Sequence, residues 1–267
     1  MQDPWLEYEK IGELGRGATS IVYAVKNRKS GADFAMKKSS ALMQEIQILK
    51  SLSHPHVIRV HEEFWCGDEL FMILEHAKTD LKKIIEKEGP FDEEKAFSLL
   101  TQLTLGLDYI HGQNVIHRDL KASNVFLGKD GLFKFGDFGS SKKLSPAEQF
   151  AETGIGTPYY MAPEVWAGEA YSFPADIWSL GCLLFQVVTG RPPFEGKNLP
   201  DLMAAILQRP LQLSPDFPQK LGGLVLRMTE KEPTKRISVS ELLADPALQK
   251  TVGLPETFPY HRPPRIL

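Results

Sequence analysis

Apolar and polar residues alternate with a period of two along most of residues 8–75, and this alternation is typical of half-buried β-strands. One stretch differs, because Glu45, Ile46 and Leu49 recur at helical spacing after Ser39 and Ser40, either of which could cap a helix. The pattern therefore predicts one helix at 41–51 and strands at 8–14, 20–26, 33–38, 57–64 and 70–75.

After residue 80 the apolar positions recur every three to four residues, which indicates amphipathic helices. Proline, glycine and serine separate these helices, which we expect at 80–88, 92–111, 175–189, 199–207, 219–228 and 238–244. We predict an α+β, bilobal fold with a small β-rich lobe (8–75), a hinge (75–79), a larger α-helical lobe (80–248) and a proline-rich tail (249–267). A ligand would bind in the cleft between the lobes.

Composition narrows the function classes. The 267 residues are 42% hydrophobic and 24% charged, as in ordinary globular proteins, and the net charge of −3 argues against a general binder of nucleic acids or anionic membranes. The two cysteines, Cys66 and Cys182, have no metal-ligand spacing, and the first residues show no signal-peptide pattern. The cysteine usage predicts a reduced compartment, so we expect an intracellular, cytoplasmic protein. The most apolar run, 177–188, is too short to span a membrane and indicates a buried helix.

Two short motifs carry the candidate chemistry. Asp119, Lys121 and Asn124 place a carboxylate, an ammonium and an amide within six residues, and an Asp-Phe-Gly triplet begins at Asp137, thirteen residues after the asparagine. Either motif alone could be a turn or a solvated cap, but in this order and spacing they resemble the catalytic and metal-binding loops of eukaryotic protein kinases. The resemblance implies that Asp119 accepts the substrate hydroxyl proton, Lys121 steadies the γ-phosphoryl group of ATP, and Asn124 and Asp137 hold Mg²⁺.

A glycine turn lies between the first two predicted strands. Gly15 and Gly17 would let backbone amides approach phosphate oxygens, although such a pair is most often only a tight turn. A Rossmann motif would need a helix next, where strand-forming residues stand, and the chain has no Gly-Lys-Ser/Thr of a P-loop. The turn resembles the kinase glycine-rich loop, with Ser20 in place of the usual third glycine. The implied nucleotide contacts are Leu14, Gly15, Arg16, Gly17, Ala18, Thr19, Ser20, Ile21 and Val22.

Lys37 ends a predicted strand and resembles the kinase lysine that binds the α- and β-phosphates and pairs with a helix glutamate. Glu45 is the matching candidate, but only eight residues separate the two, about half the distance usual in the family. Eight residues still span about 26 Å, so the pair is within reach. Because the short connection removes the first helical turn, we expect the helix to begin near Ala41 and the pair to be strained or broken without nucleotide.

The hinge resembles the adenine-binding segment of kinases. Leu74 would be the gatekeeper, and backbone groups of Glu75, His76 and Ala77 would bind the base. Asp80 would reach a ribose hydroxyl or simply cap the next helix. The resemblance also implies a purine sandwich, although plain core residues would give the same pattern; its members would be Leu14, Val22, Ala35 and Phe126.

Residues 137–164 correspond to an activation segment, and its end (150–164) resembles the NIMA-related (Nek) branch, as do the run 124–127 and Gly136. Thr157 matches the threonine that touches the catalytic aspartate and lysine. Thr153 matches a phosphorylation position or is an unmodified loop hydroxyl, and Arg118 is the residue that would grip its phosphate.

Three further matches are structural. Asp176 resembles the aspartate that braces the catalytic loop from a buried helix, and Arg236 resembles the buried partner of Glu164. The third match is an apolar stack joining the lobes, which would comprise Leu49, Val60, His117 and Phe138.

The sequence thus predicts a protein Ser/Thr kinase that uses ATP and Mg²⁺, with Lys121 favouring Ser/Thr over Tyr specificity by resemblance. The main alternative is a pseudokinase that binds nucleotide or acts as a scaffold, suggested by Ser20 and the short segment before Glu45. A small-molecule kinase fits less well, because the Ala-Pro-Glu at 162–164 belongs to protein-substrate recognition. The expected partners are protein substrates, ATP, and an upstream kinase or a second copy acting in trans, with no nucleic acid or membrane. The Nek likeness alone implies cell division, and cytoskeletal or nuclear association.

Overall fold

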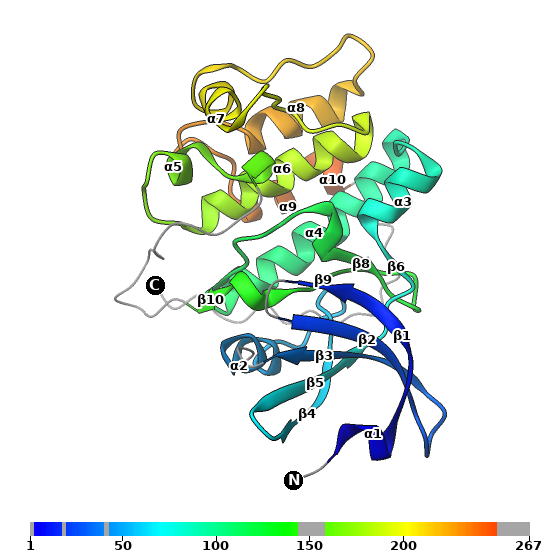
Figure 1. Ribbon diagram of the computed structural model, residues 1–267. Helices are drawn as coiled ribbons and strands as arrows, with labels where there is room; N and C mark the ends of the chain where they lie inside the picture. Colours follow the sequence, from blue (N-terminus) through cyan, green and yellow to red (C-terminus); the bar gives the residue numbers. More distant parts are fainter. Residues whose placement is uncertain (1–2, 18–19, 40–42, 144–157, 250–267) are drawn as a thin grey trace.

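The computed structural model describes residues 3–17, 20–39, 43–143 and 158–249, and it has two lobes (Figure 1). The smaller lobe is built on one antiparallel sheet with the strand order β1-β2-β3-β5-β4. Its strands are β1 (Tyr8–Arg16), β2 (Ser20–Asn27), β3 (Asp33–Ser39), β4 (Val60–Cys66) and β5 (Glu69–Glu75). The predicted α+β class, with a β-rich lobe before a helical one, is confirmed.

Strand alternation gives this sheet two different faces. Lys37 pairs with Val22 on one side and Met72 on the other, so these residues share the face that looks toward the larger lobe. The opposite face carries a separate aromatic-rich core, onto which Trp5 packs edge-on against Tyr23 at 5.6 Å between ring centroids. Trp5 belongs to α1 (Pro4–Glu7), a helix that the sequence analysis missed, although Asp3 as N-cap and Pro4 at the first turn are its ordinary signals.

The helix of the smaller lobe, α2 (Met43–Lys50), is shorter than the predicted 41–51, and residues 40–42 lie outside the described ranges. Its buried residues Ile46, Ile48 and Leu49 do not form a core of their own. They belong to the same apolar cluster as Leu103 and Phe138 of the larger lobe, so one continuous core joins the two lobes.

The larger lobe is helical and is organised around α4 and α6. The second of these is buried along nearly its whole length, because few of its positions are polar. The helices are α3 (Leu81–Glu88), α4 (Glu93–Gly112), α5 (Pro163–Trp166), α6 (Phe173–Thr189), α7 (Leu199–Gln208), α8 (Gln219–Met228), α9 (Val239–Ala244) and α10 (Pro246–Gln249). No helix in the described ranges is both long and apolar enough to cross a membrane.

Short strands near the lobe junction complete the fold and were not predicted. They are β6 (Thr79–Asp80), β7 (Val115–Ile116), β8 (Val125–Leu127), β9 (Phe133–Phe135) and β10 (Lys142–Lys143), of which β6, β8 and β9 form a three-stranded sheet. The predicted strand at 57–64 was wrong at its start. Val57 bridges Phe135 in parallel and the Ile58 N–H donates to the Phe135 carbonyl at 2.8 Å, so these residues pair with the larger lobe and β4 begins only at Val60.

Each lobe contains one free cysteine. Cys66 is half-buried at the end of β4, whereas Cys182 is fully buried in α6. Burial raises the pKa of the Cys182 thiol well above its ordinary value, so this group stays protonated.

Candidate active site

The catalytic loop after β7 is fixed by hydrogen bonds to one buried carboxylate, that of Asp176. Asp176 of α6 accepts hydrogen bonds from the backbone N–H groups of His117 (2.9 Å) and Arg118 (3.0 Å). Arg118 has a φ of 71°, a left-handed conformation that side chains rarely adopt, and the two bonds hold it there. The predicted role of Asp176 as a brace is confirmed. The sequence analysis missed a further hydrogen-bond partner of Asp176. This is His111 at the end of α4, whose Nε2 lies 2.9 Å from the Asp176 carboxylate.

Burial alone would raise the pKa of Asp176, but the hydrogen bond from His111 and the charges around it outweigh burial and lower that pKa. The brace is therefore an ionised group within a fully enclosed site. Tyr171 adds a hydroxyl bond to it at 3.2 Å.

The three polar residues of the catalytic loop contact one another. Asp119 Oδ2 accepts from Lys121 Nζ at 2.7 Å and from Asn124 Nδ2 at 3.0 Å. The same amide nitrogen donates to the Asp119 backbone carbonyl at 2.9 Å, which fixes the orientation of the asparagine. The loop thus brings a carboxylate, an ammonium and a side-chain amide into contact, and these are the groups that acid–base and phosphoryl chemistry require.

A second cluster of charges lies where β3, α2 and the Asp-Phe-Gly triplet meet. Lys37 Nζ donates to both carboxylate oxygens of Glu45 at 2.8 Å and to Asp137 Oδ1 at 2.9 Å. The expectation that the Lys37–Glu45 pair is strained or broken without nucleotide is therefore wrong, since protein groups alone close it. The reason is geometric, because α2 begins at Met43 and its first turn places Glu45 within 2.8 Å of Lys37.

The pKa directions of Lys37 and Asp137 agree with this geometry, whereas burial outweighs the Lys37 charge at Glu45 and raises the pKa of that carboxyl. Burial would lower the pKa of Lys37, but the neighbouring carboxylates of Glu45 and Asp137 outweigh burial and raise it, so the ammonium is permanent. Burial would likewise raise the pKa of Asp137, and the Lys37 charge reverses this and lowers it. The cluster therefore presents a fixed cation and an ionised carboxylate.

These donors suit Mg²⁺. The Asp137 side chain is 47% exposed, so it can reach a cation outside the protein while one oxygen stays on Lys37. The side-chain amide oxygen of Asn124 accepts no hydrogen bond from the residues that the structure describes, whereas its backbone carbonyl accepts from the Gly136 N–H at 3.0 Å. One carboxylate and one amide oxygen match the way Mg²⁺ is held in phosphate-binding sites, where water and phosphate supply the remaining ligands.

The predicted purine contacts Leu14, Val22, Ala35 and Phe126 lie on β1, β2, β3 and β8. Ala35 pairs with Leu74 across β3 and β5, and Gly15 pairs with Val22 across β1 and β2. Phe126 lies against Gly136, where a Cβ atom would come within 2.7 Å of the ring, so only glycine fits before the Asp-Phe-Gly triplet. Arg16 forms a surface pair with Glu13, and Ile21 packs against the outer core.

The structure decides between the two predicted roles of Asp80 only in part, and it does not describe four other predicted site residues. Asp80 is the N-cap of α3, accepting from the Lys83 N–H at 3.0 Å, so the capping alternative is confirmed while a ribose contact stays a prediction. Ala18, Thr19, Thr153 and Thr157 lie outside the described residues.

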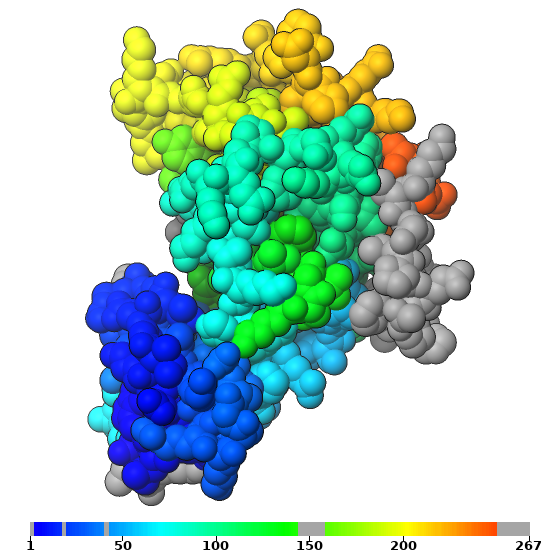
Figure 2. Space-filling model, turned by 90° about the vertical axis from the view of Figure 1, so that its right-hand side faces the viewer, coloured from blue at the N-terminus to red at the C-terminus, as the bar shows by residue number. Residues whose placement is uncertain are grey.

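The hinge carries a charge network that the sequence analysis missed. Lys134 of β9 is buried and contacts Glu75 at 2.9 Å and Asp130 at 2.8 Å. Lys129 reaches Asp33 of the smaller lobe at 2.9 Å, so the β8–β9 hairpin contacts both lobes, as Figure 2 shows for the green segment between the blue and cyan ones. The sequence signal that could have predicted a buried, paired lysine is its position between Phe133 and Phe135 in a short strand.

The remaining structural matches are confirmed. Leu49 and Phe138 share the main core, Val60 packs against it, and the His117 ring lies 4.8 Å from that of Phe138. Arg236 binds Glu164 through two parallel hydrogen bonds of 2.7 and 2.9 Å, with both side chains buried.

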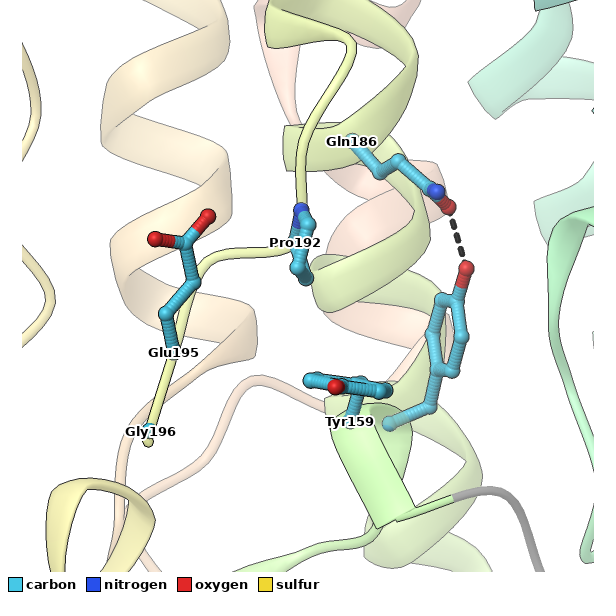
Figure 3. Close-up of a pocket in the computed structure, with 6 residues that line it drawn as sticks. Tyr159, Gln186, Pro192, Glu195 and Gly196 are labelled. Carbon is cyan, nitrogen blue, oxygen red and sulfur yellow. Dashed lines mark hydrogen bonds between the residues drawn. The ribbon is translucent and has the colours of Figure 1, made fainter. Parts of the chain in front are cut away.

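An open pocket of about 450 Å³ lies at the C-terminal end of the activation segment (Figure 3). Its lining comes from the turn after residue 157, from α6 and from the α6–α7 loop. It consists of Tyr159, Tyr160, Gln186, Pro192, Glu195 and Gly196.

Residues 8–248 match the protein kinase domain family, and the chain therefore belongs to the protein kinases. It is similar to the human serine/threonine-protein kinase Nek5, with 33% identity over 261 residues that cover 92% of this chain and 37% of that protein. Mouse Nek3 is 33% identical over 97% of this chain and 52% of its own length, and ATG1a of Arabidopsis thaliana is 39% identical over 72% and 33%. The chain spans between about a third and a half of the length of these relatives.

Proposed function

We propose that the chain is an active protein serine/threonine kinase that transfers the γ-phosphoryl group of ATP, with Mg²⁺, to hydroxyl groups of protein substrates. One observation carries the proposal: Lys37, Asp119, Lys121, Asn124 and Asp137 are all present, and each contacts another member of the set or its brace. The relatives named as serine/threonine-protein kinases support the choice of acceptor.

Bound Mg²⁺ would supply positive charge to neutralise the phosphate oxygens. Asn124 and Asp137 would hold it, while Lys37, kept in place by Glu45, would bind the α- and β-phosphates. Asp119 orients the incoming hydroxyl and accepts its proton, and Lys121 stabilises the charge of the group in transfer.

The pseudokinase alternative makes a different prediction, and two substitutions separate the possibilities. Asp119→Asn should keep nucleotide affinity but lower kcat by about 10²–10⁴-fold, because it removes the proton acceptor. Asp137→Ala should instead weaken metal-dependent ATP binding. Asp216→Asn makes the same chemical change on an exposed residue of the larger lobe and serves as the control.

The measurement is phosphate transfer from labelled ATP to a mixed protein substrate, combined with ATP binding by calorimetry. Wild-type turnover equal to that of Asp119→Asn would refute the kinase and favour the pseudokinase. An intracellular location stays a prediction from the cysteine content, and a role in cell division stays a prediction from the Nek likeness.

Regulation by phosphate is part of the proposal. Thr153 phosphate would bind the Arg118 guanidinium and order the activation segment, raising activity. Phosphatase treatment should then lower the activity of the wild type and leave Thr153→Ala unaffected. Equal activity of wild type and Thr153→Ala, with phosphate mapped elsewhere, would exclude this site.

A further inference from the structure

Two consecutive tyrosines of the pocket have different roles. Tyr160 is fixed: its hydroxyl donates to Gln186 Oε1, and its carbonyl accepts from Ser179 Oγ at 2.8 Å. Burial raises the pKa of Tyr160 to about 12, and its hydroxyl also lies near the Ala122 backbone of the catalytic loop. Tyr159 is 42% exposed. Tyr160 thus connects the pocket to the catalytic loop, whereas the exposed Tyr159 ring is able to contact a ligand.

The opposite wall presents a carboxylate on a rigid backbone. Phe194, just before Glu195, is buried and stacks on Trp178 with ring centroids 5.7 Å apart. Gly196, just after it, packs so closely that a Cβ atom would lie 2.2 Å from the backbone nitrogen of Leu202. Glu195 is therefore held from both sides while its own side chain is exposed.

Glu195 is the one charged residue among the six that line the pocket, and it has no ion pair or hydrogen bond with any residue in the described ranges. Figure 3 shows the Glu195 carboxylate beside Pro192 and the Tyr159 ring below Pro192. A planar cation can stack on a tyrosine face while a carboxylate binds its N–H groups, and guanidinium does both better than ammonium.

We infer that this pocket binds an arginine side chain of the protein substrate, so that the enzyme selects substrates with a basic residue at one fixed position relative to the phosphorylated hydroxyl. The inference rests on the proposed function. Because the pair would be partly exposed, the selection is moderate, about five-fold for arginine over leucine, and weaker for lysine.

The test is phosphorylation of a positional-scanning peptide library by the full chain. The wild type should select arginine at one position, Glu195→Gln should reduce that selection below about two-fold, and Glu195→Lys should favour glutamate at the same position. Tyr159→Ala should lower the preference for arginine over lysine. Glu169→Gln, which removes an exposed charge elsewhere on the same lobe, should retain the wild-type profile.

Absence of arginine selection in the wild type, or its persistence in Glu195→Gln, would overturn the inference. The same peptides, immobilised, are also assayed for binding, so that the two proposals fail separately. If no peptide is phosphorylated, the proposed kinase activity is wrong. Binding then tests the pocket separately, and we expect the wild type to retain arginine peptides that Glu195→Gln does not retain. Equal retention by the two proteins would overturn it.

Discussion

Three charges meet where β3, α2 and the Asp-Phe-Gly triplet converge, and they differ in their access to solvent. The side chains of Lys37 and Glu45 are 9% and 4% exposed, whereas that of Asp137 is 47% exposed. A buried charge that loses its partner is costly, while a half-exposed one is hydrated instead. Lys37 therefore supports the fold as well as the site.

Lys37→Met should consequently lower the free energy of unfolding by about 3–5 kcal/mol, because Glu45 is left buried and unpaired. Adding Glu45→Leu should recover most of that loss, while phosphate transfer stays absent in both variants. Urea unfolding measures the first effect and a kinase assay the second. A double variant no more stable than the single one would contradict this explanation.

The local motifs at this scale could be predicted because each is compact in sequence. The pairs that could not be predicted join distant residues: His111 and Asp176 lie 65 positions apart, and Lys129 and Asp33 lie 96 positions apart. Nothing in the neighbourhood of either residue encodes such a partner. The ion pair of Lys37 was misjudged for a related reason, since chain length limits reach but does not set the direction of a helix.

At the scale of elements, α4 crosses β9 and the segment before β4 at very short range. A Cβ atom on Gly106 would lie 2.9 Å from His56 Cβ and 3.0 Å from the Phe135 ring. This crossing holds the smaller lobe onto the larger one, so it depends on a residue that is otherwise unfavourable in a helix.

Gly106→Ala should destabilise the protein by about 1–3 kcal/mol through overpacking, even though alanine is the better helix former. Gly223 of α8 has nothing within 4 Å of its would-be Cβ atom and is exposed, which makes it the matched control. Gly223→Ala should stabilise by about 0.5–1 kcal/mol. Thermal unfolding of the two variants measures the sign of each change in stability. A Gly106→Ala variant more stable than the wild type would refute the close crossing.

The segment between α2 and β4 also makes stability depend on pH. His54 stacks on Tyr109 of α4 at 4.8 Å, and burial lowers its pKa from 6.5 to about 4. The unfolded chain therefore binds this proton first, so the contribution of neutral His54 is complete above pH 6.5 and is lost as the pH falls toward 4.

His54→Phe keeps a ring on Tyr109 but cannot titrate, so its stability should decline less steeply between pH 6.5 and 4 than that of the wild type. Melting temperatures measured across this range provide the comparison, and the carboxylates common to both proteins cancel. Parallel curves would show that His54 does not contribute.

Long helices were predicted well because burial of one face imposes a period on the sequence: 175–189 was expected and α6 spans Phe173–Thr189. The short strands β6 to β10 were missed because two or three residues carry no detectable period. Their pairing is decided by the partner strand, as the reassignment of Val57 to β9 illustrates.

At the scale of the whole molecule, two lobes share one apolar core. Residues of α2 and β5 pack in the same cluster as those of α4, α6 and α8, while the outer face of the sheet and the region around α5 and α7 of the larger lobe have separate clusters. The boundary between lobes is therefore a boundary in shape but not in packing.

We expect a single cooperative transition in differential scanning calorimetry, with the calorimetric enthalpy close to the van't Hoff enthalpy. Two resolved transitions, or separate folding of residues 3–75 as an isolated fragment, would show that the shared cluster does not couple the lobes.

The placement of the two thiols has a practical consequence. Cys66 sits half-buried at an edge strand of one lobe and Cys182 in the central helix of the other. A thiol reagent reaches Cys66 after a small local opening, but it reaches Cys182 only when α6 separates from its neighbours. Without any engineered label, the two modification rates in one sample therefore report the order in which the two ends of the molecule come apart.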